Sequence, residues 1–453
     1  MKFVIIGGDA AGMSAASRAK RNNPDLNVTV LEKTHDVSYS ACGMPYNIAD
    51  PDRPIDDLVV RQATVFREKQ GINLLTGHSV ESINLENQSV SGTKDNHQEF
   101  TVSYDKLLIA TGASPIFPDL PGFELPGVFG LKTLEEGRFI KEYLEKHQVA
   151  KVVIVGMGYI ALEMSEALRA RNIEVEMVKP RPELLPWMDN QLAEIVKLEL
   201  EKNGVKLHLG HGITKIVSQP GSDGLNSKLS VISSGLVLEA DMVITAIGVK
   251  PNSDFAGQSG LELGLNKAIT VERNMLTSNK NVYAAGDCAD AYHVVTGKKT
   301  YVPLALRANR AGWAVADNIS GKKIELPGIV GTSVFKVFDL EVARTGLNVK
   351  DSIANGFDAA EVYVKTRSRA HAHPGSTPIH LHMVADRKSG RLLGAQMVGR
   401  EGVAHRINAV AVALHSQMTV EQFVQCDLAY APPFSPVWDP LLTTANQLLK
   451  NVQ

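Results

Sequence analysis

The chain has 453 residues, a net charge of −2 and an apolar fraction of 44%. This length predicts about three domains, and the near-neutral charge disfavours nucleic acid and an anionic membrane surface as partners. No apolar stretch approaches the roughly 18 residues that a membrane-spanning helix needs, and three widely spaced cysteines exclude a disulfide framework or a Cys-rich zinc site. We therefore expect a cytoplasmic protein without a metal site, in which a thiol stays reduced.

The N-terminal residues predict a nucleotide-binding turn. Residues 3–6 read as a buried strand, residues 7–12 form a glycine-containing turn, a helix runs to Arg21, and residues 28–32 read as a second strand. Glycine lets a backbone approach a pyrophosphate, and the following helix N-terminus supplies free N–H groups. Glu32, twenty residues after Gly12, suits hydrogen bonds to ribose hydroxyls. The alternative for Glu32 is a solvated carboxylate at a strand end.

Cys42 stands alone about ten residues after this second strand, and the nearest other cysteine is Cys288. No local dithiol can form. A lone sulfur beside a two-electron cofactor must cycle between a thiolate and either a sulfenic acid or a mixed disulfide. The alternative is a buried structural thiol, which packs like a small apolar side chain.

The same pattern of elements returns about 150 residues later. Residues 152–155 read as a strand, 156–161 as a glycine turn, the next residues as a helix through Leu168, and 175–179 as a strand. One such turn is weak evidence, but two in the strand–turn–helix context indicate a βαβ dinucleotide fold used twice. Strands are also expected at 107–109, 242–245 and 281–284, each before a turn of small residues.

The pattern changes from about residue 326. Strands are expected at 330–337, 360–365, 379–385 and 392–399, and helices around 404–417 and 438–449. This pattern predicts an α+β third domain without a glycine fingerprint. Residues 220–227 are mostly polar and contain glycine, so we expect a mobile loop there.

Both glycine turns, the turns at Thr111-Gly112 and Gly286-Asp287, and the single Cys42 together resemble the pyridine nucleotide-disulfide oxidoreductase family. The resemblance covers essentially the whole chain. It is to the single-cysteine branch, and within that branch to the coenzyme A-disulfide reductases and NADH-dependent persulfide reductases. It implies an α/β protein with two Rossmann-like domains for FAD and for NADPH or NADH, and a C-terminal α+β dimerisation domain. The FAD domain would comprise residues 1–115 and 246–325, the NAD(P)H domain 116–245 and the dimerisation domain 326–453.

The chain departs from related sequence patterns at four places, of which the first is a variation that this branch tolerates. Asp9 stands where a strict glycine fingerprint has its middle glycine, and Ala10 where peroxidases and many oxidases carry a histidine. Ala41 stands where disulfide reductases often have asparagine. Residues 372–375 read Ala-His-Pro-Gly in place of their Tyr-Tyr-Pro-Gly. The missing histidine argues against peroxide reduction and four-electron oxygen reduction.

The resemblance implies a role for each site residue. Cys42 would be the redox nucleophile, and Tyr430 and His373 of a second subunit would reach it, with Tyr430 protonating a leaving thiolate. Tyr159 would cover the flavin until the nicotinamide displaces it, and Glu163 would lie near the carboxamide. The remaining cofactor-binding residues would be Gly7, Gly8, Ala11, Gly12, Glu32, Lys33, Ala110, Thr111, Gly112, Gly156, Gly158, Ile160, Lys179, Arg181, Gly248, Gly286, Asp287 and Pro303.

Basic residues suggest how phosphates would be bound. Lys179 stands where an NAD-binding unit usually ends in a carboxylate, and with Arg181 it suits NADPH. Arg18 and Arg21 share a helix face, and by resemblance they would lie, with Arg61 and Ser38, near the substrate's adenosine phosphates. The alternatives are surface clusters of basic residues, with NADH still accepted.

The sequence therefore predicts a homodimeric FAD enzyme that reduces a low-molecular-weight disulfide or persulfide with NAD(P)H through Cys42. Coenzyme A disulfide is the expected substrate, and the active site would be shared between subunits. The alternatives are an NAD(P)H oxidase that uses a Cys42 sulfenate, a metal-ion or quinone reductase that uses the flavin directly, and a redox-sensing protein that holds FAD without turnover.

Overall fold

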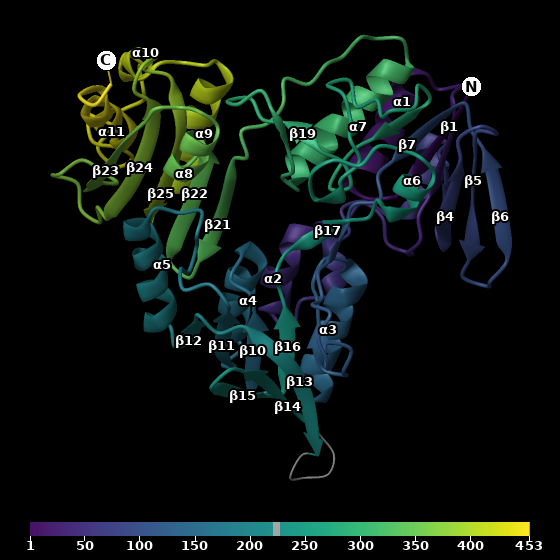
Figure 1. The fold of residues 1–453 in the computed structure, drawn as a ribbon, viewed down its shortest axis with the longest axis horizontal. Helices are drawn as coiled ribbons and strands as arrows, with labels where there is room; N and C mark the ends of the chain where they lie inside the picture. Colours follow the sequence, from purple (N-terminus) through teal and green to yellow (C-terminus); the bar gives the residue numbers. More distant parts are fainter. Residues whose placement is uncertain (221–226, 453) are drawn as a thin grey trace.

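The computed structural model describes residues 1–220 and 227–452. Three five-stranded sheets, each with its own helices, occupy three separate regions (Figure 1). The first lies at the upper right, the second at the lower centre and the third at the upper left of that view. Most of the loop expected at 220–227 lies outside the described residues.

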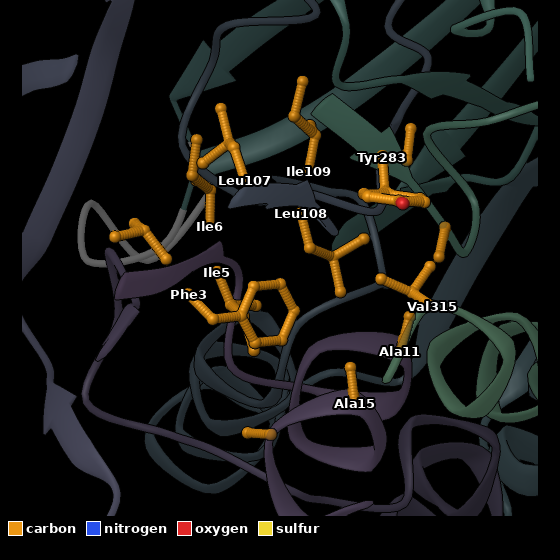
Figure 2. Close-up of a cluster of buried hydrophobic side chains, with 14 of the residues drawn as sticks. Phe3, Ile5, Ile6, Ala11, Ala15, Leu107, Leu108, Ile109, Tyr283 and Val315 are labelled. Carbon is orange, nitrogen blue, oxygen red and sulfur yellow. The ribbon is translucent and has the colours of Figure 1, made fainter. Parts of the chain in front are cut away.

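The first sheet is parallel and has the strand order β18-β7-β1-β2-β3. Its apolar strands are buried on both faces, as is expected for a parallel sheet covered by helices. Figure 2 shows Phe3, Ile5 and Leu108 packed against Ala11 and Val315 from the two covering helices. The elements are β1 (Lys2–Ile6), β2 (Asn27–Leu31), β3 (Asn73–Leu75), β7 (Lys106–Ile109), β18 (Val282–Ala284), α1 (Ala10–Asn22) and α7 (Ala305–Ile319).

The second sheet repeats this arrangement with the parallel order β12-β11-β10-β16-β9. Its elements are β9 (Val128–Phe129), β10 (Lys151–Val155), β11 (Glu174–Lys179), β12 (Val205–Leu209), β16 (Met242–Thr245), α3 (Leu134–Lys146), α4 (Tyr159–Ala170) and α5 (Asn190–Lys202). The chain passes between the first two units along an antiparallel pair, β8 (Ala113–Pro115) and β17 (Val249–Pro251).

Each of these units carries a small antiparallel sheet, and short elements fill the connections. The small sheets are β4 (His78–Asn84), β5 (Ser89–Lys94) and β6 (Glu99–Ser103) in the first unit, and β13 (Ile213–Pro220), β14 (Ser227–Ser233) and β15 (Leu236–Ala240) in the second. The short elements are α2 (Met44–Ile48), α6 (Asp254–Gln258), β19 (Ala291–Tyr292), β20 (Lys299–Thr300), the 3₁₀ turns Ala41–Gly43, Ile55–Leu58 and Leu265–Lys267, and a π turn at Val65–Lys69.

The third sheet is antiparallel, with the order β21-β22-β25-β24-β23. It has five strands, one more than the sequence pattern predicted, because residues 340–346 form a strand that the pattern missed. The hairpin turn before this strand contains Phe338, which has φ +51°. Such turns are usually recognised in a sequence by Asn-Gly or Asp-Gly, and this turn contains neither dipeptide. The elements are β21 (Ser333–Val337), β22 (Leu340–Gly346), β23 (Ala359–Arg367), β24 (Pro378–Asp386), β25 (Leu392–Gly399), α8 (Val349–Ala354), α9 (Val403–His415), α10 (Val420–Val424) and α11 (Pro440–Leu449).

The segment that follows Cys42 packs with the second unit. Met44, Ile48 and Leu58 belong to the same apolar cluster as Leu134 of α3 and Leu162 of α4. Helix α2 therefore rests on α3 and α4, and the position of Cys42 depends on both parallel units. No helix within the described ranges is long and apolar enough to cross a membrane.

Candidate active site

A cleft of about 2400 Å³ runs between the units and is bordered by the glycine turns of both parallel sheets. In open α/β sheets ligands bind outside the carboxyl ends of the strands. Most of the predicted site residues line this one cleft: Gly7, Gly8, Ala11, Arg21, Glu32, Lys33, Ser38, Cys42, Arg61, Ala110, Thr111, Gly112, Gly156, Gly158, Tyr159, Ile160, Glu163, Lys179, Arg181, Gly248, Gly286, Asp287 and Pro303.

The first turns of the two parallel units have nearly the same geometry. Gly7 has φ +109° and Gly156 has φ +111°. A Cβ added at Gly7 would lie 2.2 Å from the carbonyl oxygen of Ala110, and one at Gly156 would lie 2.3 Å from that of Ala246. Only glycine fits either position, so both turns keep their backbone exposed to the cleft, as phosphate binding requires.

Glu32 is held firmly at the end of β2. Its Oε2 accepts the backbone N–H of Gly8 at 2.7 Å, and its Oε1 accepts both the N–H and the hydroxyl of Thr34 at 2.8 Å. The carboxylate is thereby fixed at the edge of the first turn, in the place where a ribose-binding group is expected.

Asp9 is a charged group within the first turn. Burial raises its pKa from 3.8 to about 6, while the backbone N–H groups of Ala10 and Tyr39 and the nearby Lys132 act in the opposite direction. A carboxylate beside a phosphate-binding turn is unfavourable, and its readiness to take up a proton reduces that cost.

The second turn offers free space and an unused polar group. A Cβ at Gly158 would meet no atom within 4 Å. The buried hydroxyl of Thr245, at the end of β16, has no hydrogen-bond partner among the described residues. These features fit a second nucleotide, as the strand and helix pattern also indicates.

Lys179 and Arg181, the two cations near the second turn, differ in their exposure and in their hydrogen bonding. Lys179 is buried, and its Nζ donates to the carbonyl oxygen of Leu184 at 3.0 Å. Burial lowers the pKa of Lys179, and the neighbouring Arg181 lowers it further. Arg181 is exposed at the cleft. Arg181 is therefore better placed than Lys179 to bind a phosphate.

Cys42 lies in a 3₁₀ turn and its side chain is exposed to the cleft. Cys288 is buried, and its thiol donates to backbone carbonyls, so the two sulfurs have different environments. The backbone at Ser38, four residues before Cys42, has φ +51°. Such a conformation stores strain in a non-glycine residue, and strain of this kind concentrates at functional sites.

Charged groups from four segments of the chain act on the Cys42 thiol. Although the side chain opens to the cleft, desolvation by the surrounding residues raises the pKa of the Cys42 thiol, Lys132 lowers it, and Glu163, Asp287 and Asp9 raise it. Lys132 donates from Nζ to Oδ2 of Asp287 at 2.7 Å, and both side chains are largely buried. Lys132 lines the cleft but was missed in the sequence, because it stands in no recognised motif and meets Asp287 only in the folded chain.

Tyr159 lines the cleft, and its ring is turned toward the third unit. The ring centroid lies 4.8 Å from that of Phe335 and 5.8 Å from that of Trp187. Its hydroxyl is 3.2 Å from Oγ of Ser333. Whether Tyr159 covers a flavin stays a prediction, and this conformation places the side chain against β21.

Of the remaining predicted residues, Arg18, Gly12, Tyr430 and His373 do not line the cleft. Arg18 is bonded through two nitrogens to Asp317, and Gly12 supports the first turn, where a Cβ would meet the Gly7 carbonyl oxygen at 1.9 Å. Tyr430 and His373 lie in the third unit, on two loops joined by the Ala370 N–H and the Pro432 carbonyl oxygen at 3.1 Å. The structure thus brings Tyr430 and His373 into one region.

Two histidines near His373 in the sequence, His380 and His382, pair with protein groups. Nδ1 of His380 lies 2.6 Å from the hydroxyl of Tyr363, and Nε2 of His382 lies 2.6 Å from Oε2 of Glu361. Within residues 1–220 and 227–452, no group of three or more His, Cys, Asp or Glu side chains could hold a metal ion.

Comparison with known proteins identifies the architecture. Residues 1–312 match the pyridine nucleotide-disulphide oxidoreductase family and residues 332–441 match the dimerisation domain of the same family. The chain is 40% identical over 449 residues to an NAD(P)H sulfur oxidoreductase (CoA-dependent) of Pyrococcus furiosus, covering 99% of each chain. It is 34% identical over 453 residues to an NADH oxidase of Methanocaldococcus jannaschii, covering 100% of this chain and 99% of the other.

The fold is also that of a solved relative. An NAD-dependent persulfide reductase from A. fulgidus superposes with a TM-score of 0.94 at 36% identity, covering 99% of this chain and 83% of that chain. The expected fold class and the family resemblance are therefore confirmed. The chain belongs to the pyridine nucleotide-disulphide oxidoreductase family, whose members carry out oxidoreduction with FAD and NAD(P)H.

Proposed function

We propose that the protein uses NAD(P)H to reduce a low-molecular-weight disulfide or persulfide through Cys42, with coenzyme A disulfide or coenzyme A persulfide as the substrate. The observation that carries this proposal is the unpaired Cys42 thiol, exposed in a cleft that also holds two nucleotide-binding turns. The names of its relatives support sulfur chemistry and coenzyme A dependence.

The sulfur chemistry follows from a single thiol. The Cys42 thiolate attacks one sulfur of the substrate disulfide, a mixed disulfide forms, and the other sulfur leaves as a thiolate that takes up a proton. Bound FAD supplies the two-electron link between the nicotinamide and sulfur. Two electrons from NAD(P)H then cleave the mixed disulfide, the second thiol leaves, and the Cys42 thiolate is restored. The sum is one disulfide, one NAD(P)H and one proton giving two thiols and NAD(P)⁺.

The first parallel unit would hold FAD. The turn at Gly7, Gly8, Ala11 and Gly12 would approach the pyrophosphate, Glu32 would bind the ribose, and Asp287 would bind the ribityl chain. Lys33, the turn at 110–112, Gly286 and Pro303 complete this set. We assign residues 1–115 and 246–325 to the FAD domain, 116–245 to the NAD(P)H domain and 326–453 to the dimerisation domain, although α2 packs on α3 and α4.

The second parallel unit would hold NAD(P)H, with NADPH preferred. The exposed guanidinium of Arg181 can bind a 2′-phosphate through two parallel hydrogen bonds, whereas Lys179 is already bonded to the Leu184 carbonyl. Gly156, Gly158 and Ile160 would form the turn, Gly248 follows β16 and lines the same cleft, and Glu163 would face the carboxamide.

A second copy of the chain would complete the site. Tyr430, Phe434 and Trp438 are 49%, 76% and 61% exposed on the third unit, and aromatic groups exposed together mark an interface. In a homodimer, Tyr430 and His373 of the second subunit would reach Cys42, and Tyr430 would protonate the leaving thiolate. Arg21, Arg61 and Ser38 line the cleft and would bind the substrate's phosphates. A reducing cytoplasm suits this thiol chemistry.

The test compares the wild type with Cys42→Ser under anaerobic conditions. We expect the wild type to oxidise NADPH with coenzyme A disulfide and to release coenzyme A. The variant should lose this activity by a factor of about 10³ or more while it still passes electrons to a quinone, because a serine hydroxyl does not form a mixed disulfide. Mass spectrometry of untreated protein should find coenzyme A bound to Cys42.

One result would support oxygen reduction in place of disulfide reduction. A Cys42 sulfenic acid without an attached thiol, together with oxygen uptake faster than disulfide turnover, would assign the protein to the oxidases, as the M. jannaschii relative is named. The alanine at position 10 favours the disulfide reductase, since no histidine stands there to assist a sulfenic acid.

A further inference from the structure

A hydrogen bond joins the segment after Cys42 to the helix of the second nucleotide turn. The hydroxyl of Tyr46 donates to Oε1 of Glu163 at 2.8 Å. Tyr46 lies on α2, four residues after Cys42, and Glu163 lies on α4, which begins at Tyr159. Tyr46 has no part in the chemistry described above, so its bond to a residue of the cleft needs a separate explanation.

The two helices do not need this bond in order to pack together. Helices α2 and α4 are neighbours (Figure 1), and Ile48 of α2 and Leu162 of α4 are fully buried in one apolar cluster. Just after α4, Nη1 of Arg171 donates to the carbonyl oxygen of Ile48 at 3.2 Å. The Tyr46 hydroxyl therefore acts mainly on the Glu163 side chain, whose carboxylate it holds in one direction.

Glu163 has one carboxylate oxygen bound and the other free. It is partly buried and lines the cleft. Within residues 1–220 and 227–452, no Lys, Arg or His side chain forms an ion pair with it, and Oε2 accepts no hydrogen bond from the protein. A partly buried carboxylate without a neutralising cation is costly, and such groups are concentrated at ligand sites. Its free oxygen is therefore available to a donor on a ligand in the cleft.

The place of Glu163 indicates which donor this is. Helix α4 begins at the second glycine turn, where the phosphates of NAD(P)H would bind, and Glu163 lies one turn farther along the same helix, beside α2. The nicotinamide ring has to reach this part of the cleft to pass on its hydride. The N–H₂ of the carboxamide is the only hydrogen-bond donor that the ring carries, and a free carboxylate oxygen is a strong acceptor for it.

We propose that Tyr46 is a positioning residue that determines specificity for the nicotinamide carboxamide, because it holds Glu163 with its free oxygen directed to the amide N–H. The inference rests on the proposed function, in which Glu163 faces the carboxamide, and adds the residue that orients Glu163. The same bond favours the acceptor form of the side chain: burial raises the pKa of Glu163, and the hydrogen bond from Tyr46 lowers it. An ionised carboxylate only accepts hydrogen bonds.

The test measures dinucleotide binding to FAD-loaded protein with no disulfide present. The ligands are NADP⁺ and its 3-acetylpyridine analogue, in which a methyl group replaces the amide N–H₂, and dissociation constants are obtained by calorimetric titration. We expect the wild type to bind NADP⁺ about tenfold more tightly than the analogue, since one charge-assisted hydrogen bond is at stake. This preference should fall to about threefold in Tyr46→Phe and vanish in Glu163→Ala.

The double variant decides whether Tyr46 acts through Glu163. If it does, adding Tyr46→Phe to Glu163→Ala leaves both dissociation constants unchanged, since the side chain that Tyr46 holds is already absent. An undiminished preference in Tyr46→Phe, or a further change in the double variant, would overturn the proposal. Glu163→Ala is an independent check, because a preference retained in this variant overturns the proposal whatever Tyr46→Phe does.

Arg171→Met is the matched control, because it removes the other side-chain hydrogen bond between α2 and the end of α4. It should keep the wild-type preference for NADP⁺. A loss as large as that of Tyr46→Phe would show that the contact between the helices matters and not the direction of Glu163. A wild type that fails to reduce coenzyme A disulfide would refute the proposed function and leave this measurement intact, whereas equal binding of both dinucleotides by the wild type would refute only the inference.

Discussion

Removing Arg18 should destabilise the protein and leave substrate binding almost unchanged. Its Nε and Nη2 donate to the two carboxylate oxygens of Asp317 at 2.9 and 2.6 Å, which joins α1 to α7. Its guanidinium lies 5.0 Å from the centre of the Trp313 ring. Arg21, three residues later, is exposed and lines the cleft. Arg18 and Arg21 were predicted to share a helix face, but Arg18 pairs with α7 while Arg21 faces the cleft.

The expected loss of stability depends on how deeply the Arg18–Asp317 pair is buried and on the donors to Asp317 that remain after Arg18 is replaced. The side chains of Arg18 and Asp317 are 29% and 7% exposed. Breaking a buried pair costs about 3–5 kcal/mol. Asn22 and Lys322 still donate to Asp317, at 2.8 and 3.0 Å, so we expect about 2–3 kcal/mol for Arg18→Met.

The pair should also make stability depend on pH. The hydrogen bond from Arg18 is the largest of the influences that hold the pKa of Asp317 well below its ordinary value of 3.8. A carboxyl with a lowered pKa contributes stability above the unfolded value, and this contribution is lost as the pH falls below it. The difference between the wild type and Arg18→Met should therefore be full at neutral pH and shrink as the pH falls below about 4.

The assay is thermal unfolding of the FAD-loaded protein, with the KM for coenzyme A disulfide measured alongside. Arg18→Met should lower the melting temperature by several degrees and leave KM within about twofold, whereas Arg21→Met should raise KM and leave melting unchanged. The reasoning is refuted if Arg18→Met melts like the wild type and raises KM as much as Arg21→Met does.

Three further predictions concern the cleft and its supports. Arg181→Ala should raise the KM for NADPH about tenfold and that for NADH less than twofold, in steady-state kinetics, because one charge-assisted contact to the 2′-phosphate is lost. Lys141→Met should lower the free energy of unfolding by about 1–3 kcal/mol in urea titrations, because the buried Lys141 ammonium donates to the carbonyl oxygens of Arg53 and Asp50 at 2.6 and 2.9 Å. Asp9→Asn should stabilise FAD-free protein by about 1–2 kcal/mol at pH 7 and hardly at pH 4. The pKa of Asp9 is about 6 in the folded protein and 3.8 in the unfolded chain. Burial of the charged carboxylate therefore costs stability only as the pH rises through this interval. Equal melting shifts of Asp9→Asn at both pH values would contradict this reasoning.

The elements that the sequence predicted are those whose signals are local. Gly7 and Gly156 each follow a run of apolar residues and precede a helix, and the structure gives them φ values of +109° and +111°. Cys42 could be singled out because no other cysteine is near it in the chain, and it opens into the cleft beside both turns. Strand β22 was missed because its hairpin turn carries Phe338 where a glycine or asparagine would have marked it.

The side-chain hydrogen bonds in and around the site could not be predicted, because the two residues of each pair are far apart in the chain. Lys132 meets Asp287 across 155 residues, Tyr46 meets Glu163 across 117, and Arg18 meets Asp317 across 299. Two of these pairs form only when the first and second units pack together, and the Arg18–Asp317 pair forms when α1 packs on α7 within the first unit. A charged residue between motifs carries no local sign of its partner. For this reason the sequence predicted phosphate binding for Arg18 and no role for Lys132 or Tyr46.

Helix α3 explains why the position of Cys42 depends on residues distant from the sulfur. Nη1 and Nη2 of Arg138 donate to the two oxygens of Asp36 at 2.6 and 2.7 Å, and Nη2 also donates to Asp56 at 2.6 Å. Lys141, one turn later on the same helix, binds the carbonyl oxygens that follow α2. The two cations thus hold the chain on both sides of Cys42. Because Arg138 and Lys141 bind the chain before and after Cys42, substitutions at these two positions of α3 should displace the sulfur without touching it.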